Sequence, residues 1–401
     1  NNVTVVVSVR DAEGAIDNIT GGSGGDWILA GLGADIIEGG DGDNVIFGDN
    51  GKLEVFGGVH RLVAQSGLVV PTLGAGDQID SGSGFDWIIG AAGADTITDR
   101  SGGSVIIGDM GMITNNISQQ LINVMTRESE IGAGDILQSG DGNSIIFGGN
   151  GADSITTAGG DDVILGDMGA LDLIAGIRSV LNGPFEDLAH GGIDTIITGT
   201  GEDWVIGGEE GDFFTNTSGV SIFLGDAGRI EGDANGLFVR VETLQPTVGG
   251  NDKFTGGSDR DVQFGGAGED YLEGNDGGDF LLGDGGLLTR LLIQPPSGFQ
   301  LTLESTDITE GGDDSIFGGE GLDVVLGGIG NDLLSFVFKD DIAAGEFARV
   351  RFDILPDGSE KLSSFLTPAV RDLDIIVQAF LGVSTGVVRS TIVIVQDVQF
   401  F

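Results

Sequence analysis

Acidic and aliphatic positions along most of the chain recur every nine residues, with an aspartate two residues before each aliphatic position. The segment Gly21–Leu29, GGSGGDWIL, shows the unit: glycines come first, then Asp26, then Ile28. The register holds through 23 copies between Asp17 and Ser335. A period of this kind is typical of solenoids, so we expect each copy to form one turn and one short strand.

The acidic position holds aspartate in most copies and an uncharged residue in Asn44, Ser104, Ser144 and Ser221. The aspartates of this row are Asp17, Asp26, Asp35, Asp77, Asp86, Asp95, Asp135, Asp153, Asp162, Asp194, Asp203, Asp212, Asp252, Asp261, Asp270, Asp279, Asp314, Asp323 and Asp332. The aliphatic position is expected to point inward, since it alternates with its strand neighbours. It is occupied by Ile28, Ile37, Ile46, Ile88, Ile97, Ile106, Ile155, Ile164 and Val205, and by Gln263 as an exception.

A longer period groups the copies in fours. The tetrapeptide G-D-x-G begins at Gly48, Gly108, Gly166, Gly225 and Gly283, at spacings of 58 to 60 residues. Inserts that break the nine-residue rule follow, near 52–73, 112–131, 170–190, 229–248 and 287–310. Alternating residues and turn residues predict β-hairpins. The expected turns are Gly67, Asn182-Gly183, Asn235-Gly236 and Pro295–Gly298, while 112–130 has no clear turn and is compatible with a helix.

The two strands of each coil should have different outer faces. In the first and third copies of each group the outward residues are mostly polar, as in Thr96 and Thr98; in the second and fourth they are apolar, as in Trp87 and Ile89. An apolar outer face that runs the length of the roll is a larger apolar surface than a soluble monomer normally exposes. We expect the inserts to fold back over it as a third layer; the alternative is a subunit interface.

The two ends depart from the repeat. We expect an N-terminal strand or cap at 1–16, a roll at 17–335 and a β-rich C-terminal domain at 336–401, with strands at Ala348–Ile354, Leu373–Phe380 and Ser390–Phe400. The apolar run Val3–Arg10 either caps its own roll or adds to the C-terminal domain of the next subunit. Because the chain starts without Met, we expect a mature product or a piece of a longer protein.

Composition limits the partners and the source of stability. The chain has 63 Asp and Glu against 17 Lys and Arg, a net charge of −46, so nucleic acid and anionic membranes are excluded as partners. Cysteine is absent, so disulfides cannot hold the fold. There is no run of 18 apolar residues that would predict a membrane helix. So acidic a chain repels itself when compact unless cations neutralise it.

The repeat resembles the GGxGxDxUx nonapeptide of RTX, or hemolysin-type, calcium-binding proteins, and the resemblance covers about Asp17 to Ser335. It implies an all-β parallel β-roll in which the row aspartates and turn carbonyls hold multiple Ca²⁺ ions. We expect a full row of ions along the turns before odd-numbered copies and a patchier row along the others. Asp49, Asp109, Asp167, Asp226 and Asp284 of G-D-x-G either add ligands to the patchier row or only shape the exit of the inserts.

No catalytic motif is evident. The only histidines, His60 and His190, have no partner motif, and the carboxylate pairs that a glycosidase would use are already explained by calcium. We expect no enzyme. Two functions remain: a structural subunit of an extracellular fibre, sheath or surface layer, partnered by itself or by other surface components, or an adhesin or rod segment of a giant surface protein. The resemblance also implies export by a type I route from a Gram-negative bacterium.

Overall fold

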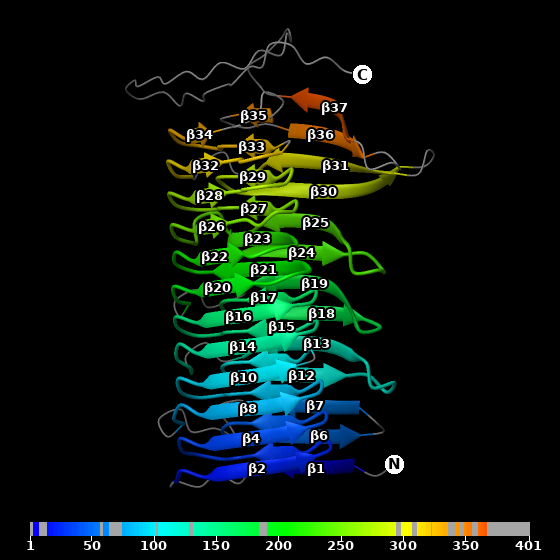
Figure 1. The fold of residues 1–401 in the computed structure, drawn as a ribbon, viewed down its shortest axis with the longest axis vertical. Coiled ribbons are helices and arrows are strands. Elements are labelled where there is room, and N and C mark those ends of the chain that lie inside the picture. Colours follow the sequence, from blue (N-terminus) through cyan, green and yellow to red (C-terminus); the bar gives the residue numbers. More distant parts are fainter. Residues whose placement is uncertain are drawn as a thin grey trace. The chain divides into compact units, whose positions relative to one another are not determined.

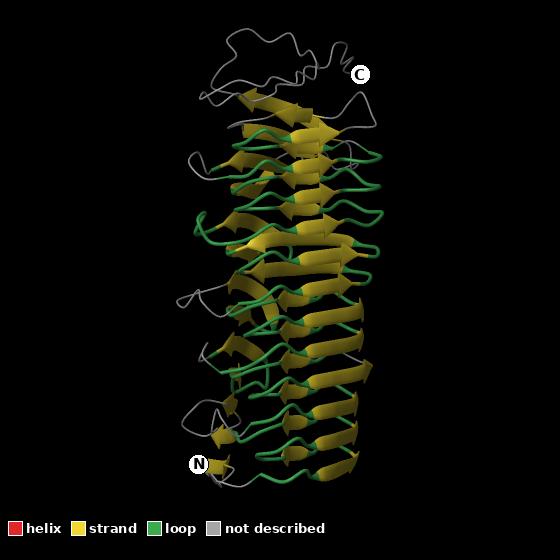
Figure 2. Ribbon diagram, turned by 90° about the vertical axis from the view of Figure 1, so that its left-hand side faces the viewer, coloured by secondary structure: helices red, strands yellow, loops and turns green. Residues whose placement is uncertain are grey.

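In the computed structural model the described residues form β-strands joined by turns and loops, with no helix among them (Figures 1 and 2). It describes the chain except for 1–2, 8–13, 57–58, 64–73, 102, 128–130, 184–190, 294–297, 307–310, 322, 336–341, 345–348, 355–359 and 367–401. None of the described residues forms a helix that could cross a membrane. The chain divides into two compact units, Asn1–Glu209 with Ala234–Gly236, and Glu210–Asp233 with Leu237–Phe401.

Odd-numbered copies of the repeat form one parallel sheet of the first unit, which we call sheet B. Its strands, in order, are β2 (Asn18–Ser23), β4 (Ile36–Asp41), β8 (Gln78–Ser83), β10 (Thr96–Ser101), β14 (Ile136–Asp141), β16 (Ser154–Gly159) and β20 (Thr195–Thr198). The stacking is in register, so that Ile37 lies opposite Ile79 and Ile97 follows it. Successive coils therefore place equivalent residues above one another.

Even-numbered copies form the second parallel sheet, sheet C. Its strands in the first unit are β3 (Trp27–Leu29), β5 (Val45–Phe47), β9 (Trp87–Ile89), β11 (Val105–Ile107), β15 (Ile145–Phe147), β17 (Val163–Leu165) and β21 (Glu202–Gly208). The inward residues Ile46, Ile88, Ile97 and Ile106 are fully buried between the two sheets. This pair of sheets confirms the predicted β-roll.

The inserts of the first unit form an antiparallel sheet, sheet A. Its strands are β1 (Val3–Val7), β6 (Lys52–Phe56), β7 (Val59–Val63), β12 (Gly111–Asn115), β13 (Leu121–Thr126), β18 (Ala170–Ile174) and β19 (Ile177–Gly183). A Cβ on Gly111 would come within 2.5 Å of the outward side chain of Ile107 in sheet C. Sheet A therefore packs on the outer face of sheet C.

The buried tryptophans confirm this third layer. Trp87 and Trp204, on the outer face of sheet C, are 9% and 0% exposed. Trp27 lies on β3, the terminal strand of sheet C in the described residues, and is 47% exposed. Because sheet A covers the outer face of sheet C, that face can be apolar without a subunit interface.

The hairpins differ from the sequence predictions in their turns. The described part of the segment 112–130 does not form a helix, because β12 and β13 pair antiparallel around a turn in which the Asn116 side chain accepts the Ser118 N–H. Asn182 and Gly183 end β19; the turn is instead at Ala175-Gly176, with φ of 56° and 80°. Gly67 lies outside the described residues, and its hairpin turns between Phe56 and Val59.

The second unit repeats the three-sheet plan. Sheet B contains β22 (Phe213–Asn216), β26 (Lys253–Thr255), β28 (Tyr271–Glu273), β32 (Ser315–Phe317) and β34 (Leu333–Ser335). Sheet C contains β23 (Val220–Asp226), β27 (Val262–Phe264), β29 (Phe280–Leu282), β33 (Val324–Leu326) and β35 (Ile342–Ala344). Sheet A contains β24 (Gly228–Gly232), β25 (Phe238–Thr243), β30 (Gly286–Ile293), β31 (Gly298–Ser305), β36 (Arg349–Ile354) and β37 (Glu360–Leu366).

Three inward positions of the second unit, Phe214, Phe223 and Phe254, are aromatic, whereas those of later coils, such as Leu272 and Leu281, are aliphatic as in the first unit. Phe214 and Phe254 stack with ring centroids 4.8 Å apart, and Phe223 lies 5.6 Å from Phe214. Gln263 is buried among them and donates from Nε2 to the Glu273 carbonyl at 3.2 Å. The turn at Asn235-Gly236 lies between β24 and β25, as predicted.

The ends of the chain meet the predictions in part. Val3–Val7 pairs antiparallel with Lys52–Phe56 of its own chain, which is the local arrangement predicted for the N-terminal strand. β36 confirms the strand expected at Ala348–Ile354. Leu373–Phe380 and Ser390–Phe400 lie outside the described residues. The strands β35 and β37 had not been predicted.

Candidate calcium-binding edges

The turns of each unit form two edges, which we name by the aspartate that ends each turn. Each turn of the odd edge leads from sheet C into sheet B and ends at a row aspartate such as Asp95 or Asp153. Each turn of the even edge leads from sheet B into sheet C and ends at a residue such as Asp86 or Asp162. Glycine makes these turns possible. Gly31 and Gly33, in the turn before Asp35, have φ of 109° and 133°, which L side chains rarely adopt.

In most row aspartates one oxygen accepts a backbone N–H of the preceding coil. Oδ1 of Asp77 accepts the backbone N–H of Asp35, one coil back, at 2.7 Å, and Oδ1 of Asp95 accepts that of Asp77 at 2.7 Å. On the even edge Oδ1 of Asp86 accepts the N–H of Asn44 at 2.7 Å. This ladder holds the stacked carboxylates in equivalent positions in successive turns.

In many odd-edge aspartates the other oxygen is buried, and the described residues supply no donor to it. Beside it lies the first glycine of the turn: a Cβ on Gly90 would be 2.3 Å from Oδ2 of Asp95, and one on Gly148 would be 2.1 Å from Oδ2 of Asp153. Burying a carboxylate oxygen without a donor or a cation is costly. The odd-edge atoms in this position include Oδ2 of Asp35, Asp77, Asp95, Asp135, Asp153, Asp252, Asp270 and Asp314.

The electrostatics show the same need for a cation. Burial, with repulsion from Asp35, raises the pKa of Asp77 to about 7, and burial raises that of Asp314 to about 8. For Asp95, burial and then repulsion from Asp135 hold the pKa well above its ordinary value. Carboxylates stacked in this way become compatible when a divalent cation or protons neutralise them.

These residues fit Ca²⁺, which prefers six to eight oxygen ligands in a flexible geometry. Within the described ranges no three His, Cys, Asp or Glu side chains converge on one point. A calcium site here would therefore combine one or two row carboxylates with turn carbonyls, whose direction the glycines allow.

The G-D-x-G aspartates lie on the odd edge, so the prediction that they supply ligands to the even edge is wrong. Asp109 accepts the N–H of Ala133 at 3.2 Å and that of Asn150 at 2.5 Å, and its pKa is raised by burial and by Asp135. Asp226 accepts from Gly250 at 3.1 Å and from Ala267. The insert interrupts the turn here, and the carboxylate joins its two halves, which favours the role of shaping the exit.

The even edge is built differently in its middle section. Glycine is replaced at the first position of six consecutive even turns by a buried side chain: Ser81, Asp99, Ser139, Thr157, Thr198 and Asn216. The hydroxyls of Thr157 and Thr198 face Asp162 and Asp203 and lower the pKa of each, although neither pair is aligned as a regular hydrogen bond. Burial outweighs them, so that the pKa values are about 7 and about 6.

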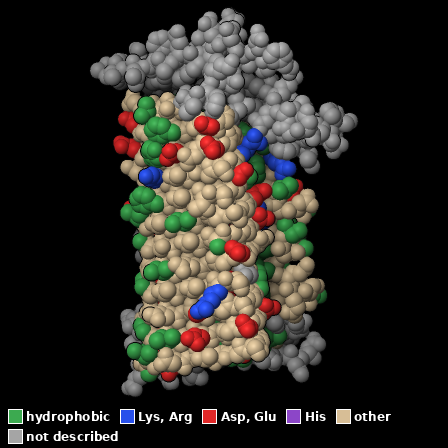
Figure 3. Space-filling model, viewed as in Figure 1, with side chains coloured by type: hydrophobic (Ala, Val, Ile, Leu, Met, Phe, Trp, Pro, Cys, Tyr) green, Lys and Arg blue, Asp and Glu red, His purple; other side chains and the backbone are tan. Residues whose placement is uncertain are grey.

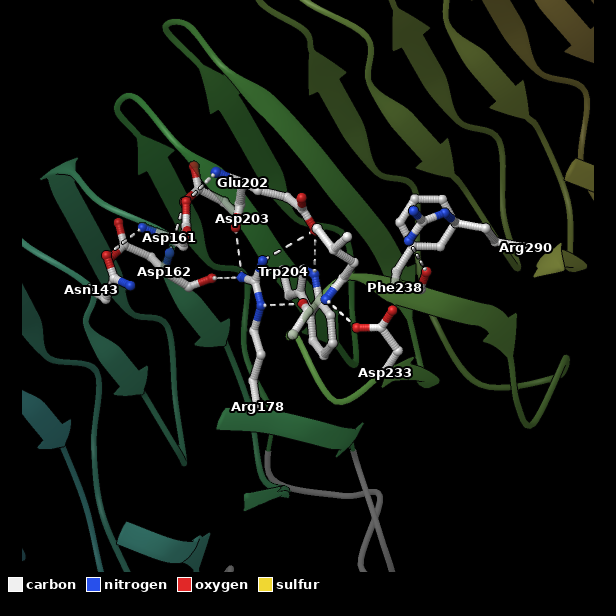
Figure 4. Close-up of polar contacts among 12 residues, drawn as sticks. Asn143, Asp161, Asp162, Arg178, Glu202, Asp203, Trp204, Asp233, Phe238 and Arg290 are labelled. Atoms are coloured by element: carbon white, nitrogen blue, oxygen red, sulfur yellow. Dashed lines mark hydrogen bonds and ion pairs between the residues drawn. The ribbon is translucent and has the colours of Figure 1, made fainter. Parts of the chain in front are cut away.

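An arginine of the hairpin sheet reaches this edge (Figure 4). Arg178, on β19, donates from Nη1 to the carbonyl of Glu202 at 2.6 Å and from Nη2 to Oε1 of Glu202 at 3.1 Å. Its guanidinium lies 4.4 Å from the ring centre of Trp204. Sequence reasoning missed this residue, because nothing along the chain connects an insert to a turn 24 residues later.

The predicted aspartates differ in their surroundings. Those inside the stacks are buried, whereas Asp17 is exposed, and Asp26 and Asp332 are half-buried. The nine-residue spacing continues from Asp332 to Asp341, which lies outside the described residues. The strand that follows, β35, was missed, although it pairs in register with β33. The unbroken spacing of nine was a signal that could have found it.

The geometry defines a class of protein, a parallel β-roll with buried aspartate rows at its turns. The family model for the RTX calcium-binding nonapeptide repeat matches residues 20–52, 73–102, 132–170, 189–220, 255–286 and 308–334. The chain therefore carries the RTX calcium-binding repeats that its sequence resembled, a repeat that serves as a structural calcium-binding module and is typical of extracellular proteins. No curated protein matches the chain.

Proposed function

We propose that the chain is an extracellular, calcium-dependent structural protein, a subunit of a surface fibre, sheath or layer that assembles through end-to-end contacts. The observation that carries the proposal is the odd edge, where buried carboxylate oxygens such as Oδ2 of Asp95 and Asp153 lack donors among the described residues. A fold of this kind gains its cohesion where Ca²⁺ is abundant, as it is outside cells.

End-to-end contact is supported by Trp27. It is 47% exposed on the terminal strand β3, while Trp87 and Trp204 are buried at equivalent positions along sheet C. A large aromatic side chain of this kind is a frequent anchor of protein interfaces. Addition of Val3–Arg10 to another subunit is less well supported, because Val3–Val7 already pairs with β6.

The proposal is tested by adding Ca²⁺ to purified, calcium-free protein and following light scattering and electron micrographs. Calcium-dependent folding followed by polymers supports the structural role, and Trp27→Ser should then fold but polymerise less. Folding into stable monomers at high protein concentration contradicts assembly.

The alternative is an adhesin that binds through its row of inserts. It is favoured by the exposed apolar residues at hairpin tips of the first unit, Ile117 and Ile174, which are 76% and 69% exposed. Monomers that adhere to cells or immobilised glycans in Ca²⁺, and lose adhesion in the variant Ile117→Ser with Ile174→Ser, would support this function instead.

A further inference from the structure

The two edges of the roll offer different surroundings to a cation, and the difference begins at the first position of each turn. On the odd edge this position is glycine in Gly90, Gly148, Gly265 and Gly327, and a Cβ there would collide with the row carboxylate. On the even edge from Ser81 to Asn216 it carries a buried side chain. A side chain therefore occupies this space in the even turns, although Oδ2 of Asp86, Asp162 and Asp203 is buried without a regular hydrogen bond there too.

In the first unit the filled turns also have a cation of their own. The side chain of Arg178 is 11% exposed and donates to carbonyls of two successive even turns, that of Glu202 at 2.6 Å and that of Asp162 at 3.4 Å. Its charge acts on Asp162, Asp203 and Glu202. A guanidinium held here opposes the approach of a second cation and neutralises part of the charge that Ca²⁺ would otherwise neutralise.

In the second unit an amide takes the corresponding place. Nδ2 of Asn216 donates to Oδ1 of Asp261 at 3.1 Å and to the carbonyl of Gly219 at 2.8 Å. Asp261 also accepts the N–H of Ser221 at 2.9 Å and, on Oδ2, the N–H of Gly257 at 2.9 Å. Both oxygens of Asp261 are thus satisfied by the protein, unlike Oδ2 of Asp252 and Asp270 on the odd edge.

Side-chain nitrogens serve even-edge carbonyls elsewhere as well. Nδ2 of Asn44 donates to the carbonyl of Ser81 at 3.1 Å, and Nδ2 of Asn275 to that of Gly256 at 2.8 Å. On the odd edge a comparable contact in the described part of the chain is longer, 3.4 Å from Asn150 to the carbonyl of Gly132. The turn carbonyls of the even edge are therefore more fully used by the protein itself.

We propose that the even turns ending at Asp162, Asp203 and Ser221 bind no Ca²⁺, and that Arg178 in the first unit and Asn216 in the second hold them together instead. In these coils bound Ca²⁺ lies on the odd edge, and Asp162 and Asp203 support the fold of their turns without coordinating metal. The inference rests on the proposed calcium dependence and adds where within each coil the ions bind.

The test is a crystal structure of the wild-type protein grown in Ca²⁺, with ions located by anomalous scattering. We expect ions beside Asp95, Asp135 and Asp153, and none within coordination distance of Asp162 or Asp203. An ion bound to either of the last two carboxylates overturns the inference. Absence of ions from both edges contradicts the proposed function as well, so the two failures are distinguishable.

Calcium titration by calorimetry provides a second arm in solution. Thr198→Gly opens the space beside Asp203, and we expect it to bind about one more Ca²⁺ per chain than the wild type, with a further gain in affinity when combined with Arg178→Gln. Thr195→Gly, an exposed change on β20 of the same coil, is the matched control and should leave the stoichiometry unchanged. Equal stoichiometry for Thr198→Gly and the wild type counts against the inference.

Discussion

The odd edge and the even edge arise from the same nonapeptide, yet they surround their row carboxylates differently. Oδ2 of Asp153 and Oδ2 of Asp162 are both buried without a hydrogen-bond partner in the described structure, but glycine lies beside Asp153, whereas Thr157 lies beside Asp162 in the next turn along the chain. Figure 3 shows acidic side chains only scattered over the face drawn there, because the row aspartates are buried. One repeat can therefore place its row carboxylates in two different surroundings.

We expect the largest loss of structure when Ca²⁺ is removed. With a chelator at neutral pH we expect the far-ultraviolet circular dichroism of the strands to be lost, because stacked odd-edge carboxylates repel one another without a cation. Restoring Ca²⁺, but not Mg²⁺ at equal concentration, should recover the signal. A protein that keeps its β signal in chelator contradicts the role assigned to the odd edge.

Neutralising one aspartate on each edge should lower the free energy of unfolding by different amounts on the two edges. Asp153→Asn and Asp162→Asn both keep the oxygen that accepts a backbone N–H at 2.6 and 2.7 Å. If Asp153 binds an ion, losing it costs about 2.7 kcal/mol when Ca²⁺ is at 100 times its dissociation constant. In urea unfolding with Ca²⁺ present, we expect a much smaller loss of unfolding free energy for Asp162→Asn. Equal losses for the two variants would contradict the assignment of Ca²⁺ to the odd edge.

Acid should partly substitute for calcium on the odd edge. The pKa of Asp77 is raised from 3.8 to about 7 by burial and by Asp35. The folded, calcium-free state therefore holds this proton more tightly than the unfolded state, so its stabilisation is complete below about pH 4 and is lost as pH rises through about 7. In chelator, the strand signal in circular dichroism should therefore be stronger at pH 5 than at pH 8, and Asp77→Asn should flatten this trend. A rise in stability with pH would contradict it.

We expect the smallest change in stability from replacing an exposed arginine near the even edge. Arg100 pairs with Asp80 on sheet B, but its side chain is 70% exposed, against 11% for Arg178. Water and salt screen an exposed ion pair, so Arg100→Ala should scarcely move the urea midpoint. A loss comparable to that of Arg178→Ala would show that burial does not distinguish the two arginines.

Much of the fold was predictable, because the nine-residue period fixes where the turn glycines, the row aspartate and the inward residue lie in each copy. Asp95 and Ile97 are placed by their sequence neighbours alone, and hydrogen-bonded stacking repeats that placement from coil to coil. The hairpin turns were less predictable. Ala175-Gly176 and Asn182-Gly183 are both plausible turn residues, and pairing of β18 with β19 selected the first.

The sequence by itself determined the roll, its aspartate rows and the apolar outer face of sheet C, because these depend on contacts that recur at a fixed spacing. Only the tertiary structure decided what covers that face, that Asp109 and Asp226 belong to the odd edge, and that Arg178 reaches the even turns. Each of these contacts joins an insert or its exit to a coil elsewhere in the stack. No local spacing encodes such a pairing, and the packing of sheet A against sheet C is what creates it.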